Sequence, residues 1–249
     1  MKTMSKLSAL AFACLSLLCF SCTKPEEEEE PDKIVIPEAV DLGLSVKWAS
    51  FDIGATKPGE PGYFFSWGET APKDAFYNWS NYAWSNNSPR SLTKYNYNPA
   101  YGSNIDYRVA LKPEDDAAHV LLGEGWHVPT REDIQELIDS PLLTQSIEKV
   151  GLIDCLKLTS IKTGKSIMFP AAGNCDGTKF PVNSENYAGY FWTAEIEYTE
   201  NRFLYDVYNP SRAYCLMVSP HVRTPSLNNM SLPTSDRAFG MNIRAVYSK

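Results

Sequence analysis

Residues 126–138 read Trp-His-Val-Pro-Thr-Arg-Glu-Asp-Ile-Gln-Glu-Leu-Ile and hold the clearest helix signal in the chain. Thr130 is a favourable N-cap residue, and Asp133, three positions later, can complete a capping box. Acidic residues in a first turn also interact favourably with the helix dipole. Ile134, Leu137 and Ile138 then recur at helical spacing. The stretch therefore predicts a helix that begins after Thr130 and packs on a core through these three residues.

Short runs of β-branched and aromatic residues, bounded by turn residues, dominate the rest of the chain. The predicted strands are Ile34–Ile36, Val46–Ser50, Tyr63–Trp67, Leu156–Ile161, Ser166–Phe169, Tyr190–Thr193, Phe203–Val207, Ala213–Val218 and Met241–Tyr247. A second, weaker helix is expected over Thr144–Val150. Many short strands with one or two helices, and no regular alternation of the two, predict an α+β fold.

The N-terminus resembles the signal of a bacterial lipoprotein. Residues 1–21 have a basic start, an apolar run over Leu7–Phe20 and a small residue, Ser21, directly before Cys22. The run of 14 residues is shorter than the roughly 20 that a membrane-spanning helix needs. We predict a cleaved lipoprotein signal peptide and lipid attachment at Cys22. Cys14 is the alternative lipidation site, and an ordinary secretory signal is the alternative interpretation.

Residues 22–33 form an acidic tether that contains Glu26–Glu30 and therefore repels itself into extended conformations. A Lys followed by acids close behind the lipidated Cys resembles the surface-export signal of Bacteroidetes lipoproteins. This resemblance implies an outer-membrane lipoprotein exposed on the cell surface, with the membrane as a partner through its lipid anchor. The alternative interpretation is a solvated linker that carries no export signal.

Residues 34–249 have a length that suits a single domain, and no linker interrupts them. The chain of 249 residues is 43% hydrophobic, which is typical of a folded protein. Its formal charge of −7 gives no basic face for phosphates, so a nucleic-acid partner is not expected. Four tryptophans in or beside predicted strands are expected in the core: Trp48, Trp67, Trp126 and Trp192.

The common catalytic motifs do not explain the remaining residues. Thr163-Gly164 reads as a hairpin turn rather than as part of a phosphate-binding loop, because Thr159 stands where that loop needs glycine. Ser66 likewise lacks the glycine, replaced by Phe64, that a nucleophile elbow requires. We therefore expect no catalytic residues from these motifs.

Metal and thiol chemistry receive little support. The histidines, His119, His127 and His221, are too dispersed for a metal motif, so no metal site or cofactor is predicted. The acids of residues 114–116 favour a helix start or a solvated turn, and calcium binding through loops stays open without assignable ligands. Cys155, Cys175 and Cys215 either form one disulfide with one thiol left over or are all buried thiols.

Residues 76–107 combine many aromatic rings with Asn, Ser and Pro, which is typical of a recognition surface. The candidate ligand-binding residues are Trp79, Tyr82, Trp84, Tyr95 and Tyr97. The alternative is that these rings cover the core beneath a long loop.

Six blocks lie in order along the chain: Val40–Phe51, Gly62–Ala71, Asp115–Arg131, Ile167–Asn174, Gly189–Glu195 and Arg237–Tyr247. Together they resemble the Fibrobacter succinogenes major paralogous domain family. The resemblance implies a C-type-lectin-like fold related to the formylglycine-generating enzymes, in which a segment such as Trp126–Thr130 opens a helix. His127 stands there at the place of the family's usual Arg.

The resemblance leaves two functions to weigh. Formylglycine-generating enzymes use two cysteines close in sequence, and this domain has no such pair. We therefore predict a non-catalytic, surface-displayed binding module, adhesin-like or contacting a glycan or an extracellular protein. The alternative is an enzyme of the formylglycine-generating type whose active site the sequence does not reveal.

Overall fold

The helix predicted after Thr130 is present in the computed structural model. α2 (Arg131–Asp139) begins at a complete capping box, in which the Asp133 N–H donates to Thr130 Oγ1 at 3.1 Å and the Thr130 N–H donates to Asp133 Oδ2 at 2.8 Å. Ile134 and Leu137 are buried on one face of the helix. The prediction is confirmed, because the cap and the apolar stripe favour the same helix.

The structure describes residues 34–181, 188–198, 208–221 and 229–248, so Cys22, the tether and the predicted strand Phe203–Val207 lie outside the described residues. Residues from Ile34 onward form one compact unit. Besides α2, the elements are β1 (Ala39–Val40), β2 (Lys47–Ala49), the 3-10 helices η1 (Trp79–Asn81), η2 (Pro99–Tyr101) and η3 (Pro113–Asp115), α1 (Ala117–Leu122), β3 (Trp126–His127), β4 (Leu143–Val150), β5 (Ile153–Ser160), β6 (Ser166–Pro170), β7 (Gly189–Ile196), β8 (Arg212–Val218), β9 (Met230–Ser231), β10 (Thr234–Asp236) and β11 (Val246–Tyr247). In the part of the chain that the structure describes, no helix is both long enough and apolar enough to cross a bilayer.

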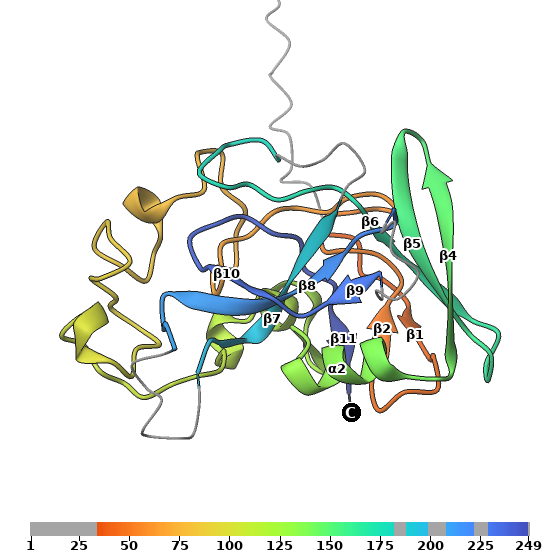
Figure 1. Ribbon diagram of the computed structural model, residues 1–249, viewed down its shortest axis with the longest axis horizontal. Coiled ribbons are helices and arrows are strands. Elements are labelled where there is room, and N and C mark those ends of the chain that lie inside the picture. Colours follow the sequence, from red (N-terminus) through yellow and green to blue (C-terminus); the bar gives the residue numbers. More distant parts are fainter. Residues whose placement is uncertain (1–33, 182–187, 199–207, 222–228, 249) are drawn as a thin grey trace, which may run out of the picture. The chain divides into compact units, whose positions relative to one another are not determined.

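These strands pair into three antiparallel sheets (Figure 1). One sheet has the order β1-β2-β11-β3, the second has the order β10-β8-β7 with β9 also paired to β8, and the third has the order β4-β5-β6. The fold is thus mostly β, with several short antiparallel sheets and, among the described residues, two short α-helices.

The second helix that we expected, over Thr144–Val150, is wrong. This segment is part of β4, which pairs residue by residue with β5, from Leu143 opposite Ser160 to Val150 opposite Ile153. Apolar residues in a short segment fit both the period of a helix and that of a strand. Here the tight turn at Gly151 brings two strands of equal length together. Tertiary pairing therefore decides the structure of a segment whose own sequence is ambiguous.

Other strand predictions hold in part. Ile34–Ile36 is not in a strand, and Tyr63–Trp67 contributes a single bridge, between Phe65 and Met241. Of the predicted strand Met241–Tyr247, only β11 forms a ladder. Outside β11, the segments Tyr63–Trp67 and Met241–Tyr247 thus pair with their neighbours through isolated bridges. The predicted hairpin turn is confirmed, since Gly164, with a φ of +71°, links β5 to β6.

The core contains two clusters of buried side chains, and the four tryptophans divide between them. Trp67, Trp126 and Trp192 lie in the first cluster, whereas Trp48 lies in the second, beside the buried face of α2. All four are nearly inaccessible to solvent, as predicted. The acids of residues 114–116 do mark a helix start, because Asp116 caps α1 by accepting from the Ala118 and His119 N–H groups.

Candidate functional site

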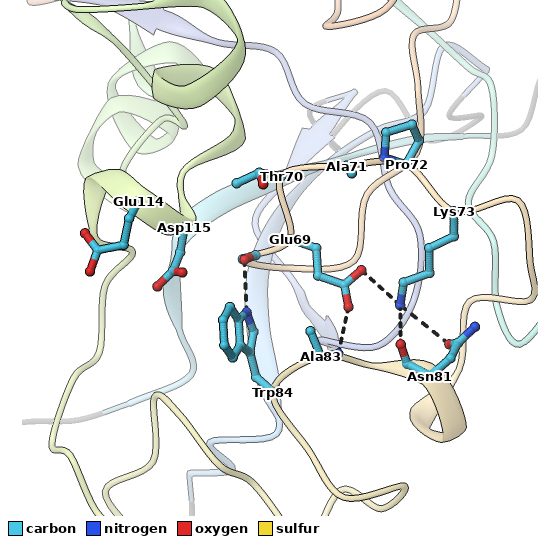
Figure 2. A pocket seen from close by; sticks show the side chains of 11 residues that line it. Glu69, Thr70, Ala71, Pro72, Lys73, Asn81, Ala83, Trp84, Glu114 and Asp115 are labelled. Carbon is cyan, nitrogen blue, oxygen red and sulfur yellow. Dashed lines mark hydrogen bonds and ion pairs between the residues drawn. The ribbon is translucent and has the colours of Figure 1, made fainter. Parts of the chain in front are cut away.

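The candidate site is an open pocket of about 480 Å³, which we call the Trp84 pocket. Three segments meet there, as Figure 2 shows: residues 68–73, residues 81–84 and the acids of η3. The residues that line it are Gly68, Glu69, Thr70, Ala71, Pro72, Lys73, Asn81, Ala83, Trp84, Glu114 and Asp115.

A network of polar contacts ties two walls of the pocket together. Glu69 Oε2 pairs with Lys73 Nζ at 3.0 Å, and Glu69 Oε1 accepts from the Ala83 N–H at 2.8 Å. Lys73 Nζ also donates to the Asn81 carbonyl at 3.0 Å (Figure 2). Both charged side chains are largely buried, which limits screening by solvent. The shape of the pocket is therefore set by its own residues.

Trp84 is the aromatic side chain of the pocket, and its indole is fixed on two sides. Its Nε1–H donates to the Gly68 carbonyl at 2.9 Å, and Lys94 Nζ lies 4.4 Å from the ring centroid. Gly68 has a φ of +76°, and a Cβ there would lie 3.1 Å from Trp84 Nε1. Glycine is thus needed at position 68 both for the backbone conformation and for the close approach of the indole.

Asp115 forms the base of the opposite wall and is buried despite its charge. Its carboxylate accepts hydrogen bonds from Lys94 Nζ and from the Tyr95 hydroxyl. That hydroxyl in turn accepts from the Lys112 N–H at 3.0 Å. Burial, reinforced by the hydrogen bond to Asp115, raises the pKa of Tyr95, so its hydroxyl stays protonated and keeps donating.

Arg237 lies beneath these residues and is inaccessible to solvent. Its guanidinium donates to the Tyr82 hydroxyl at 3.0 Å and to three carbonyls, those of Lys94, Tyr95 and Pro210. It also lies 4.8 Å from the centroid of the Trp67 ring. One buried cation therefore holds together the segments that carry Lys94 and Tyr82.

Three of the five candidate aromatic residues are not available to a ligand, which corrects the sequence interpretation. Tyr82, Tyr95 and Tyr97 are at most 8% exposed. Each hydroxyl finds a partner inside the domain: Tyr82 donates to the Trp67 carbonyl at 2.8 Å and Tyr97 to the Glu197 carbonyl at 2.9 Å. A tyrosine can be buried when its polar end is satisfied in this way, so these rings belong to the core.

The two remaining candidates, Trp79 and Trp84, are partly exposed, and only Trp84 lines the pocket. Trp79 packs edge-on against Tyr82, with ring centroids 5.4 Å apart. Glu69 and Lys73 were not among the residues predicted from the sequence, where Asp115 was assigned only to a helix start or a solvated turn. The opposite charges of Glu69 and Lys73, four residues apart, were the available signal, but such a pair is equally typical of a solvated turn.

The described part of the chain, the pocket included, contains no group of three or more His, Cys, Asp and Glu residues that could hold a metal ion. His127 Nε2 lies 3.1 Å from Ser248 Oγ, and His221 Nε2 lies 2.8 Å from Asp154 Oδ2. Glu195 accepts from the Arg131 N–H at the start of α2, and burial raises its pKa to about 7.

The three described cysteines are free and buried, which agrees with the second of the two alternatives left open by the sequence. Burial raises the pKa of Cys155 to about 11 and those of Cys175 and Cys215 to about 12. The thiolate is the reactive form of cysteine, so these surroundings disfavour reaction at neutral pH.

Comparisons of this chain with models of protein families, with curated proteins and with solved structures found no match.

Proposed function

We propose that the chain is a non-catalytic lipoprotein displayed on the cell surface, which binds its ligand in the Trp84 pocket. The main support is the way the protein's own groups hold the indole, with the Gly68 carbonyl on its edge and the Lys94 ammonium on its face. An aromatic ring that is already ordered loses little entropy when a ligand stacks on it. This is the property expected of a recognition site.

The chemistry of the lining favours a neutral glycan as the ligand. The charges of the pocket are matched in pairs, so little net charge is left to attract an ion. Glu69 pairs with Lys73 and Asp115 with Lys94, and the more exposed Glu114 lies 3.7 Å from Lys112 Nζ. A sugar ring offers an apolar face for an indole and hydroxyl groups for the polar rim, where Asn81 is exposed. An extracellular protein is the other ligand class to distinguish.

The finer fold assignment also belongs to this proposal. In the family that the sequence resembles, a segment such as Trp126–Thr130 opens a helix, and here this segment leads directly into α2. Together with the short antiparallel sheets, this supports a C-type-lectin-like fold of the Fibrobacter succinogenes major paralogous domain type.

Replacing Trp84 by alanine tests the binding site. We expect the affinity for a glycan selected on an array of neutral oligosaccharides to fall by about 30-fold, equivalent to about 2 kcal/mol for an anchoring aromatic residue. Trp79→Ala is the matched control, because Trp79 is a partly exposed ring of the same segment that does not line the pocket. Circular dichroism of both variants checks that they fold. Equal losses from the two substitutions, or binding only to proteins, would contradict the glycan site.

A second experiment tests the anchor, which rests on the Ser21-Cys22 junction. Cys22→Ser should move the protein out of the outer-membrane fraction or leave it unprocessed, because no acyl chains would be attached. Cys14→Ser is the matched control, since it removes the alternative lipidation site and should leave fractionation unchanged. Protease treatment of intact cells measures display on the surface. Release by Cys14→Ser instead would show that the anchor lies at the other cysteine.

The alternative function, an enzyme of the formylglycine-generating type, gains no specific support from the described residues. Its chemistry needs activated thiols, whereas Cys155, Cys175 and Cys215 are buried with raised pKa values. We therefore favour the binding module.

A further inference from the structure

β4 is a long edge strand with most of its surface in solvent. Six of its eight residues, those between Leu143 and Val150, are exposed. Among the described residues it pairs only with β5, and Figure 1 shows it as the outermost strand of its sheet. An edge of this length is a template on which another strand can pair.

β4 lacks the features that usually protect such an edge. It contains no proline, and its register with β5 runs from one end to the other without a bulge. Its two charged side chains face their own hairpin, since Glu148 pairs with Lys157 and Lys149 pairs with Asp154, each at 2.7 Å. Charges used within the hairpin do little to repel an incoming strand.

The hydrogen bonds around β5 show which main-chain groups of β4 point outward. The Ala171 N–H donates to the Asp154 carbonyl at 2.9 Å, so even-numbered residues of β5 face β6. Odd-numbered residues of β5 then face β4, where the register pairs them with even-numbered residues. The main-chain groups of Ile147 and Lys149 therefore point away from β5.

Ile147 also leaves apolar surface exposed at the middle of this edge. It lies opposite Leu156, which is fully buried, yet 46% of Ile147 itself is exposed. A β-branched apolar side chain in the centre of an open strand is well suited to pack against another strand.

We infer that β4 pairs antiparallel with β4 of a second copy of this chain, across a twofold axis at Ile147. The pairing would join two three-stranded sheets into one of six strands. This interface is independent of the Trp84 pocket, to which β4 contributes no residue.

The charges of the strand and the position of Ile147 together select this register, because a shift toward Leu143 brings no like charges together but sets each Ile147 opposite Gln145. Centred on Ile147, the pairing brings the two Ile147 side chains together and sets Glu148 opposite Ser146, so no like charges meet. A shift by one hydrogen-bonded step toward the hairpin tip would place the two Glu148 side chains opposite each other. An interface across a twofold axis must be complementary to itself, and the register centred on Ile147 meets this condition.

Sedimentation of the whole chain tests the interface, with Cys22→Ser in every sample so that a lipid cannot cause association. We expect reversible dimers, and we expect Ile147→Lys to lower the association constant by about a hundredfold, because two ammonium groups would then meet at the axis. Ile161→Lys is the matched control, since Ile161 is 66% exposed but lies outside β4. A monomeric wild type, or equal losses from both variants, would overturn the inference.

Cysteine cross-linking tests the register without relying on a charge. Paired residues of a hydrogen-bonded antiparallel site have Cα atoms about 5.5 Å apart, which suits a disulfide. Ile147→Cys should therefore form covalent dimers on mild oxidation. Leu152→Cys, although 89% exposed, should not, because its two copies would lie about 34 Å apart in this register. Cross-linking of Leu152→Cys as readily as Ile147→Cys would overturn the twofold pairing at Ile147.

Discussion

Replacing Arg237 by methionine is expected to lower the free energy of unfolding by about 4 kcal/mol or more. The guanidinium is inaccessible to solvent and donates to the Tyr82 hydroxyl and to three carbonyls, with donor–acceptor distances between 2.8 and 3.1 Å. Methionine fills much of the space but donates nothing, so these buried acceptors lose their donor. Each such loss costs about 1–3 kcal/mol.

Chemical denaturation of the purified chain measures this effect. Arg237→Lys should fall between wild type and Arg237→Met, because an ammonium keeps the charge but cannot reach four acceptors with the fork of a guanidinium. Arg90→Met is the matched control: Arg90 is exposed, and its guanidinium carbon lies 5.6 Å from the Tyr101 ring centroid. Arg90→Met should lower the free energy of unfolding by no more than about 0.5 kcal/mol. A similarly small loss for Arg237→Met would show that the buried network does not hold the fold.

The second large effect is expected at Asp52, which forms an ion pair with Arg244 in the interior. Asp52 Oδ1 accepts from Arg244 Nε at 2.7 Å, and neither side chain is accessible to solvent. Asp52→Ala leaves the guanidinium buried without its counter-charge and should destabilise the domain by about 3–5 kcal/mol. Arg244 Nη2 also donates to the Met168 carbonyl at 2.7 Å, so the cation has little freedom to move away.

A double replacement separates the charge from the packing. Asp52→Leu with Arg244→Met removes both charges, and it should be less destabilising than Asp52→Ala because no uncompensated ion remains. The same denaturation measures the two single variants, Asp52→Leu and Arg244→Met. If the loss of stability in the double variant equals the sum of their losses, the pair contributes no coupling energy.

The ionisation of Asp52 adds a dependence on pH. Burial raises its pKa from 3.8 to about 6, outweighing the opposite effect of Arg244. Because the folded-state pKa lies above the unfolded value, ionising Asp52 costs the folded state more than the unfolded state, so the proton-linked part of the free energy of unfolding is fully present below about pH 3.8 and is lost as the pH rises through about 6. The Asp52→Ala variant should lack this part of the pH dependence.

The sequence was most informative where local chemistry and packing agree. Thr130 and Asp133 predict the start of α2 because their capping contacts need only neighbouring residues. By contrast, Thr144–Val150 has no capping box, because Ile147 stands three residues after Thr144, and its pairing with β5 decides its structure. Local pattern therefore identifies an element only when no distant partner competes for it.

The candidate site was less predictable, because exposure depends on the path of the whole chain. Tyr95 and Trp84 belong to one aromatic stretch, yet Tyr95 is fully buried while Trp84 borders the pocket. Arg237 and Arg244 gave no sign of burial except their place in an otherwise apolar stretch. Charged residues are rarely buried without partners, and those partners come from distant segments.

The position of β11 governs when this domain can fold. β11 lies between β2 and β3, so Val246 pairs with Trp48 on one side and with His127 on the other. Synthesis from the N-terminus therefore leaves Trp48 with its β1 partner, Val40, but without its β11 partner until almost the whole domain has been made. Topologies that depend on such distant pairings fold slowly. The domain accordingly completes its folding after translation, and a chain truncated before β11 loses an interior strand of a sheet rather than a dispensable tail.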